Sequence, residues 1–146
     1  MQELEILMRN VLSNTFIMYF RTHSYHWNVE GPNFMEYHGF FNTLYDELFD
    51  AVDPIAEEIR ALDLYAPISL ADLYKTKTVQ EDSVKPDTKT MFTNLIADNE
   101  AVLSTLNAAF KVATAMDKQG LINFLASRID VHNKHGWMLR SYTKAM

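Results

Sequence analysis

The fold is decided by residues 26–57, which read HWNVEGPNFMEYHGFFNTLYDELFDAVDPIAE. The EGPN segment predicts a turn between two helices, with one helix ending near His26 and the next beginning at Pro32 or Asn33. The side chains on this stretch that could bind a metal are His26, His38, Asn42, Asp53 and Glu57. Imidazoles and carboxylates together form a mixed nitrogen and oxygen ligand set, which suits iron, zinc or manganese.

The spacing of these residues argues against a metal site built by one chain. Asp53 follows His38 by 15 residues, which corresponds to about 22 Å along a helix axis. At about 100° per residue, however, the polar residues from His38 to Glu57 fall in one stripe of the helix. Between its polar ends the stripe is filled by Phe41, Tyr45, Leu48, Phe49 and Val52. A second copy packed antiparallel across a two-fold axis near Glu47 and Leu48 would bring histidines of one chain to carboxylates of the other.

The run from His26 to Asp63 resembles the signature of the Dps family, the small ferritin-like cages that oxidise and store iron. That signature is a His-Trp pair, a second His twelve residues later, and then an Asp and a Glu four residues apart. Here it is matched by His26-Trp27, His38, Asp53 and Glu57. The closing HNKHGWMLRSY is a weaker match to the same family.

The resemblance implies a ferroxidase that oxidises Fe(II) to Fe(III), with hydrogen peroxide as the preferred oxidant, and stores the product. It also implies a homo-oligomer, most often a dodecamer, that protects against oxidative damage. Its iron would be held by His26 and His38 of one chain and by Asp53 and Glu57 of its two-fold mate.

Asn42 departs from the family pattern, which usually has an aspartate four residues after the second histidine. An amide offers a carbonyl oxygen but no charge, so we expect one good iron position and a weak or absent second one. Asp46, one helical turn further on, could compensate, although we interpret it as a surface residue.

The hydrophobic pattern predicts an all-α chain, with residues 1–146 forming a single ferritin-like four-helix-bundle domain. The predicted long helices are Gln2–Asn28, Asn33–Leu62, Thr88–Met116 and Leu121–Tyr142. A long crossover, residues 64–87, carries a short extra helix that is expected to cover the second helix. Pro54 predicts a kink in the second helix between Asp50 and Pro54.

Composition narrows the class of protein further. Hydrophobic residues make up 48% of the chain, with only 4 Gly and 4 Pro, which favours a compact helical protein. The absence of cysteine excludes disulfides and thiolate metal sites. The opening MQELEIL lacks the basic residues of a signal peptide, and no uncharged run near it is long enough to span a membrane, so we expect a cytoplasmic protein.

Two other functions compete with iron oxidation. A nucleoid-associated cage would bind DNA, but the net charge of -6 and the lack of lysine-rich ends predict little or no DNA affinity. The other hypothesis is a structural oligomer whose metal site has decayed, and Asn42 is its only support. The chain has no Glu-x-x-His pair, which disfavours a di-iron centre inside one bundle. We therefore assign His132 and His135 to helix packing or hydrogen bonding.

Overall fold

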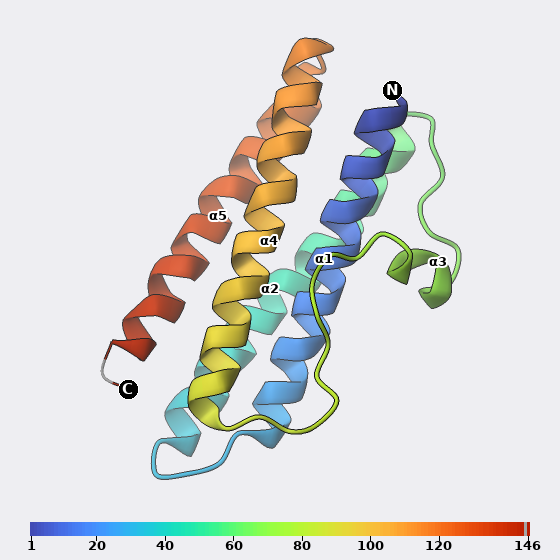
Figure 1. Cartoon of the computed structure of the whole chain (residues 1–146). Helices are drawn as coiled ribbons and strands as arrows, with labels where there is room; N and C mark the ends of the chain where they lie inside the picture. Colours follow the sequence, from blue (N-terminus) through green and yellow to red (C-terminus); the bar gives the residue numbers. More distant parts are fainter. Residues whose placement is uncertain (145) are drawn as a thin grey trace.

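The computed structural model describes residues 1–144 and 146, and this part of the chain contains five α-helices and no β-strand (Figure 1). The helices are α1 (Gln2–Asn28), α2 (Phe34–Ala61), α3 (Leu70–Tyr74), α4 (Thr88–Ala115) and α5 (Gln119–Thr143). The four long helices form a bundle, and α3 lies in the connection between α2 and α4. This confirms the predicted all-α four-helix bundle with a crossover helix. No helix in the described residues is both long and apolar enough to cross a membrane.

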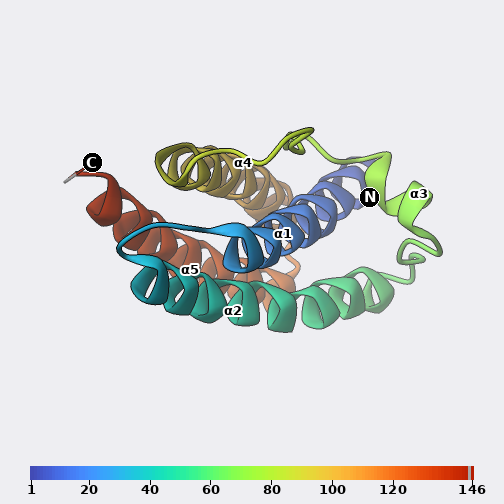
Figure 2. The same cartoon turned by 90° about the horizontal axis from the view of Figure 1, so that it is seen from below.

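Helix α1 contacts both α2 and α4, so the bundle is built around it. It pairs antiparallel with α2 through a short turn, and α4 pairs with α5 in the same way. The crossover, residues 62–87, runs back along the bundle, so that α2 and α4 point in the same direction (Figure 1). Figure 2, seen from below, shows α1 between α2 and α4.

The short helix α3 packs on α1, so our expectation that it covers the second helix was wrong. The hydroxyl of Ser13 on α1 donates to the Leu73 carbonyl at 2.7 Å, and Leu73 is the buried side chain of α3. Arg9 lies 3.7 Å from the carboxylate of Asp72. Helix α1 thus offers α3 both polar partners and apolar contact, which keeps the outer face of α2 clear of this segment.

The apolar stripe predicted on the second helix is divided between two surfaces. Phe41 and Leu48 are fully buried in the core of this chain, whereas Phe49 is 55% exposed. Tyr45 and Val52 are half-buried. A stripe that covers about 100° of a helix is wide enough to reach both the core and the outer surface. The outer face of α2 is therefore narrower than the stripe we predicted.

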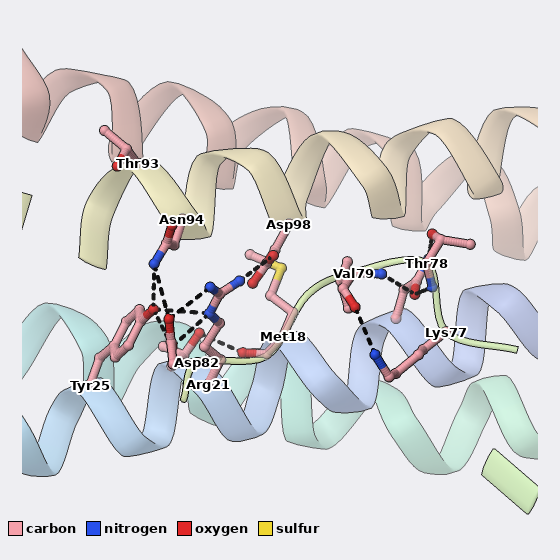
Figure 3. Close-up of polar contacts among 12 residues, drawn as sticks. Met18, Arg21, Tyr25, Lys77, Thr78, Val79, Asp82, Thr93, Asn94 and Asp98 are labelled. Atoms are coloured by element: carbon pink, nitrogen blue, oxygen red, sulfur yellow. Dashed lines mark hydrogen bonds and ion pairs between the residues drawn. The ribbon is translucent and has the colours of Figure 1, made fainter. Parts of the chain in front are cut away.

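Arg21 ties α1 to the crossover and to α4 (Figure 3). Its guanidinium donates to Asp98 on α4 at 2.8 Å and to Asp82 on the crossover at 3.0 Å. Tyr25 donates to the same Asp82 at 2.7 Å and accepts a bond from Asn94. Burial raises the pKa of Asp98 to about 6, although Arg21 acts in the opposite direction. This cluster anchors the crossover on the side of α1 that faces α4.

Pro54 lies inside α2, which continues through it from Phe34 to Ala61. Because proline has no N–H, the carbonyl of Asp50 loses its helical hydrogen bond. The kink between Asp50 and Pro54 stays a prediction.

Candidate metal-binding histidines and their surroundings

The turn between α1 and α2 brings the two motif histidines together. Gly31 has a φ of 116°, a conformation that side-chain-bearing residues rarely adopt, and it reverses the chain within a few residues. His26 is in the last turn of α1, and His38 is near the start of α2. Their rings stack with centroids 3.7 Å apart and planes 14° from parallel.

Reciprocal hydrogen bonds fix the orientation of both rings. His26 Nδ1 lies 2.8 Å from the carbonyl oxygen of His38, and His38 Nδ1 lies 2.7 Å from the carbonyl oxygen of His26. A carbonyl oxygen only accepts, so each Nδ1 must carry the proton and donate it. In a neutral imidazole the lone pair is then on Nε2, which is the arrangement that a metal-binding histidine requires. Both rings are half-buried, so they are held by the chain but still reachable.

The carboxylates of the motif lie elsewhere on the chain. Asp53 and Glu57 are exposed on the second half of α2, and 15 residues of continuous helix, about 22 Å, separate Asp53 from His38. Among the described residues, no group of three or more His, Asp or Glu side chains is placed to hold a metal ion. The structure thus unites the two histidines but does not bring the carboxylates to them.

The side chain of Asn42 is already engaged by its neighbours. Tyr45 donates its hydroxyl to Asn42 Oδ1 at 3.1 Å. Asn42 Nδ2 donates to Asp46 Oδ2 at 2.9 Å. The amide therefore ties an exposed carboxylate to the stretch that follows His38. We had interpreted Asp46 as a surface residue, and it is exposed, but no sequence pattern predicted this bond.

His23 belongs to an aromatic cluster beside His26. Its ring stacks on Tyr45 with centroids 3.8 Å apart, and its Nδ1 lies 3.0 Å from the Tyr19 hydroxyl. Trp27 lies against its other side at 4.3 Å between centroids. Burial lowers the pKa of His23, and the nearby His26 acts in the same direction. The helical spacing of these residues is the signal from which this cluster could have been found.

A second polar cluster joins α2, α4 and α5, and an arginine pairs with its carboxylate. Glu47 on α2 accepts from Arg128 Nη1 at 2.5 Å and from His135 Nε2 at 2.6 Å, both on α5. Arg128 also donates to His132 Nε2, while His132 Nδ1 donates to Asn99 on α4. The assignment of His132 and His135 to hydrogen bonding is thus confirmed. Because the guanidinium supplies the positive charge opposite Glu47, this cluster needs no metal.

Large aromatic side chains are exposed next to the histidine pair. Phe20 and Trp27 on α1 are 51% and 57% exposed, and Phe49 on α2 is 55% exposed. Tyr19 contacts Phe49 at 5.1 Å between ring centroids, and Phe20 contacts Trp27 at 6.3 Å. We call Phe20, Trp27 and Phe49 the outer aromatic face. The outer aromatic face leaves apolar area of α1 and α2 exposed in this chain.

Comparison with known proteins places this arrangement in a family. Residues 7–146 match the family profile described as Ferritin-like domain. The DNA protection during starvation protein of Brevibacillus brevis is 26% identical over 141 residues, which cover 97% of this chain and 95% of that protein.

Solved structures of Dps proteins are similar to this chain over nearly its whole length. The X-ray structure of Dps from Thermosynechococcus elongatus superposes with a TM-score of 0.93 at 26% identity, covering 97% of this chain and 90% of that one. The Dps protein of Vibrio cholerae O1, described as a member of a broad superfamily of ferritin-like diiron-carboxylate proteins, has a TM-score of 0.91 at 26% identity. The match covers 97% of this chain and 89% of the Vibrio cholerae chain. The chain therefore belongs to the ferritin-like family and, within it, to the Dps group.

Proposed function

We propose that this protein oxidises ferrous iron and stores the product in a cage of identical subunits. Each iron site is shared by two subunits, with His26 and His38 from one, and Asp53 and Glu57 of the partner subunit. The observation that carries the proposal is the reciprocal bonding of the two imidazoles, which leaves both Nε2 lone pairs free at one place. Description of the Vibrio cholerae relative as a diiron-carboxylate protein supports the choice of metal.

The positions along α2 support an antiparallel pairing of two copies. The midpoint in sequence between His38 and Glu57 falls between Glu47 and Leu48, and so does the midpoint between Asn42 and Asp53. In two antiparallel helices related by a two-fold axis at that level, His38 is level with Glu57 of the partner subunit. One axis thus matches the spacing of both pairs and generates two identical sites.

The outer aromatic face supports the same pairing. Its three members are each more than half exposed, Trp27 directly follows His26, and Phe49 is within two residues of the level of the proposed axis. Burying apolar area contributes roughly 25 cal/mol per Å², so a second copy on this face would gain from covering it. Helix α3 packs on α1 and leaves this face open.

The ligand types fit the reaction. Imidazole nitrogens bind ferrous iron well, and the two carboxylates offset the extra positive charge of the ferric product. With hydrogen peroxide as oxidant, two ferrous ions each lose one electron, and the O–O bond takes up both as it breaks. Two hydroxide ions result, so no hydroxyl radical is released. The ferric product collects inside the cage, which we expect to have twelve subunits by resemblance to the Dps family and to lie in the cytoplasm.

A complementation experiment tests whether the site is shared. One variant, H26A/H38A, keeps its carboxylates, and the other, D53N/E57Q, keeps its histidines. Each cage alone should fail to oxidise ferrous iron when peroxide is added, as followed by ferric absorbance. When the two chains are refolded together at random, about half the two-fold pairs are mixed and about a quarter of all sites are complete. We expect roughly that fraction of wild-type activity to return.

Two outcomes contradict the proposal. A site built within one chain would show no recovery on mixing, because neither variant holds a complete set. Wild-type protein that oxidises iron no faster than buffer would exclude the activity altogether. Light scattering on each sample shows whether the cage has assembled, so that a failure to form oligomers is not mistaken for loss of the site.

A further inference from the structure

Asn42 is poorly placed to bind iron itself. Its carbonyl oxygen accepts the Tyr45 hydroxyl, and its amide nitrogen faces Asp46. A metal at Asn42 would have to compete with Tyr45 for that oxygen and would gain no charge from it. The bond to Asp46, in contrast, holds a carboxylate that is exposed to solvent.

We propose that Asp46, held by Asn42, supplies the carboxylate of a second iron position, opposite Asp53 of the partner subunit. This inference rests on the proposed function, because it needs the two-fold pair of α2 helices. It assigns Asn42 as a positioning residue and Asp46 as the ligand. The second iron would then lie one helical turn nearer the two-fold axis than it would with a ligand at residue 42.

The distances along the helices permit this assignment. Residue 42 is level with Asp53 of the partner subunit, and Asp46 is four residues further along, about 6 Å nearer the axis. A metal ion that bridges two carboxylates spans roughly 4 Å between their oxygens, and each side chain adds its own reach. The offset along the helix axis therefore lies within the combined reach of the ion and the two side chains.

The hydrogen bond from Asn42 leaves one oxygen of Asp46 available to a metal ion. Only Oδ2 accepts from Asn42, so the second oxygen is free of that bond. A neighbouring group that orients a metal-binding carboxylate commonly raises the affinity 10-fold to roughly 100-fold. Asp46 also restores the negative charge that an asparagine at position 42 lacks. Glu36 is exposed on the same helix but lies about 160° around it from His38 and ten residues from Asp46, which makes it a matched control.

Anaerobic titration of the assembled protein with Fe(II), followed by calorimetry, tests the assignment. The wild type should show two binding steps per site, a tight one at the histidines and a weaker one. D46N should weaken the second step by at least about 10-fold and leave the first within about 2-fold. N42A should also weaken the second step, since Asp46 loses its hydrogen bond, whereas E36Q should change neither step.

Rescue makes the test specific. N42D/D46N moves the carboxylate back by one turn, and we expect it to recover the second step. A single step in the wild type, or two unchanged steps in D46N, would overturn the assignment of Asp46. If the first step is present and sensitive to H38A in that case, the proposed function survives and only this inference fails. If the wild type binds no ferrous iron, both fail. Circular dichroism and light scattering confirm that each variant folds and assembles.

Discussion

Replacing Glu47 with glutamine tests the ion pair that holds α2 against α5. Burial alone would raise the pKa of Glu47, but hydrogen bonds from His135 and Arg128 outweigh it and lower the pKa from 4.5 to about 2. At about 1.36 kcal/mol per pKa unit, a shift of this size corresponds to about 3 kcal/mol. The Glu47 side chain is 32% exposed, and solvent screening reduces this figure to about 2 kcal/mol.

The pH dependence of this contribution has a definite sign. The carboxylate is more acidic in the folded chain, so its stabilisation is complete above pH 4.5 and is lost as the pH falls towards about 2. E47Q has no titrating group at this position, and all other carboxylates are shared with the wild type. The difference in unfolding free energy between the two proteins therefore follows Glu47 alone. It should be about 2 kcal/mol at neutral pH and should narrow by more than half at about pH 3.

Urea unfolding followed by circular dichroism measures this difference. Chain concentration must be the same in all samples, because assembly contributes to the stability of an oligomer. Glu58 lies on the same helix and forms no ion pair within the described residues, so E58Q is the matched control. Removing both charges in E47Q/R128M should recover part of the loss, since it leaves no unpaired charge, although the buried His132 Nε2 loses its donor. A difference that stays constant with pH, or one under about 0.5 kcal/mol at neutral pH, would refute this reasoning.

Asp98 should respond to pH in the opposite direction. Burial raises its pKa from 3.8 to about 6, so the wild type should gain stability over D98N as the pH falls from about 6, as measured by urea unfolding. Y25F removes the hydroxyl that donates to Asp82 and accepts from Asn94, and thermal unfolding should show a loss of about 1–2 kcal/mol. With a net charge of -6 per chain, the protein should not retard duplex DNA in a gel-shift assay at low salt. Retardation would favour a nucleoid-associated role instead.

Local patterns were sufficient to predict the helices. The bounds predicted for α1 are those observed, and α4 begins at the predicted Thr88, where the Asp87 carboxylate accepts from the Thr90 N–H. Glycine, proline and capping side chains act within a few residues, so they can be identified without a structure. The closeness of His26 and His38 follows from the same local turn.

Contacts between distant segments could not be predicted in this way. Glu47 meets Arg128 across 81 positions of sequence, and Arg21 meets Asp98 across 77. Neither pair leaves a periodic signal, because the spacing depends on how whole helices pack. The bond from Asn42 to Asp46 is local, but an amide and a carboxylate four residues apart are common on helix surfaces. Only the side-chain positions show which of such pairs are joined.

The ion pair between Glu47 and Arg128 also determines which face of α2 points away from the core. Glu47 must point inward to meet Arg128, and the fully buried Leu48 lies next to it on the core side. A helix turns by about 100° per residue, so fixing Glu47 fixes the direction of every other side chain on α2. His38 and Asp53 then fall on the outer side, and His38 and Glu57 lie at equal distances along the sequence from the level of the proposed two-fold axis. Losing the ion pair should therefore weaken the proposed shared site without changing a proposed ligand, which separates the role of Glu47 from the role proposed for Asp53.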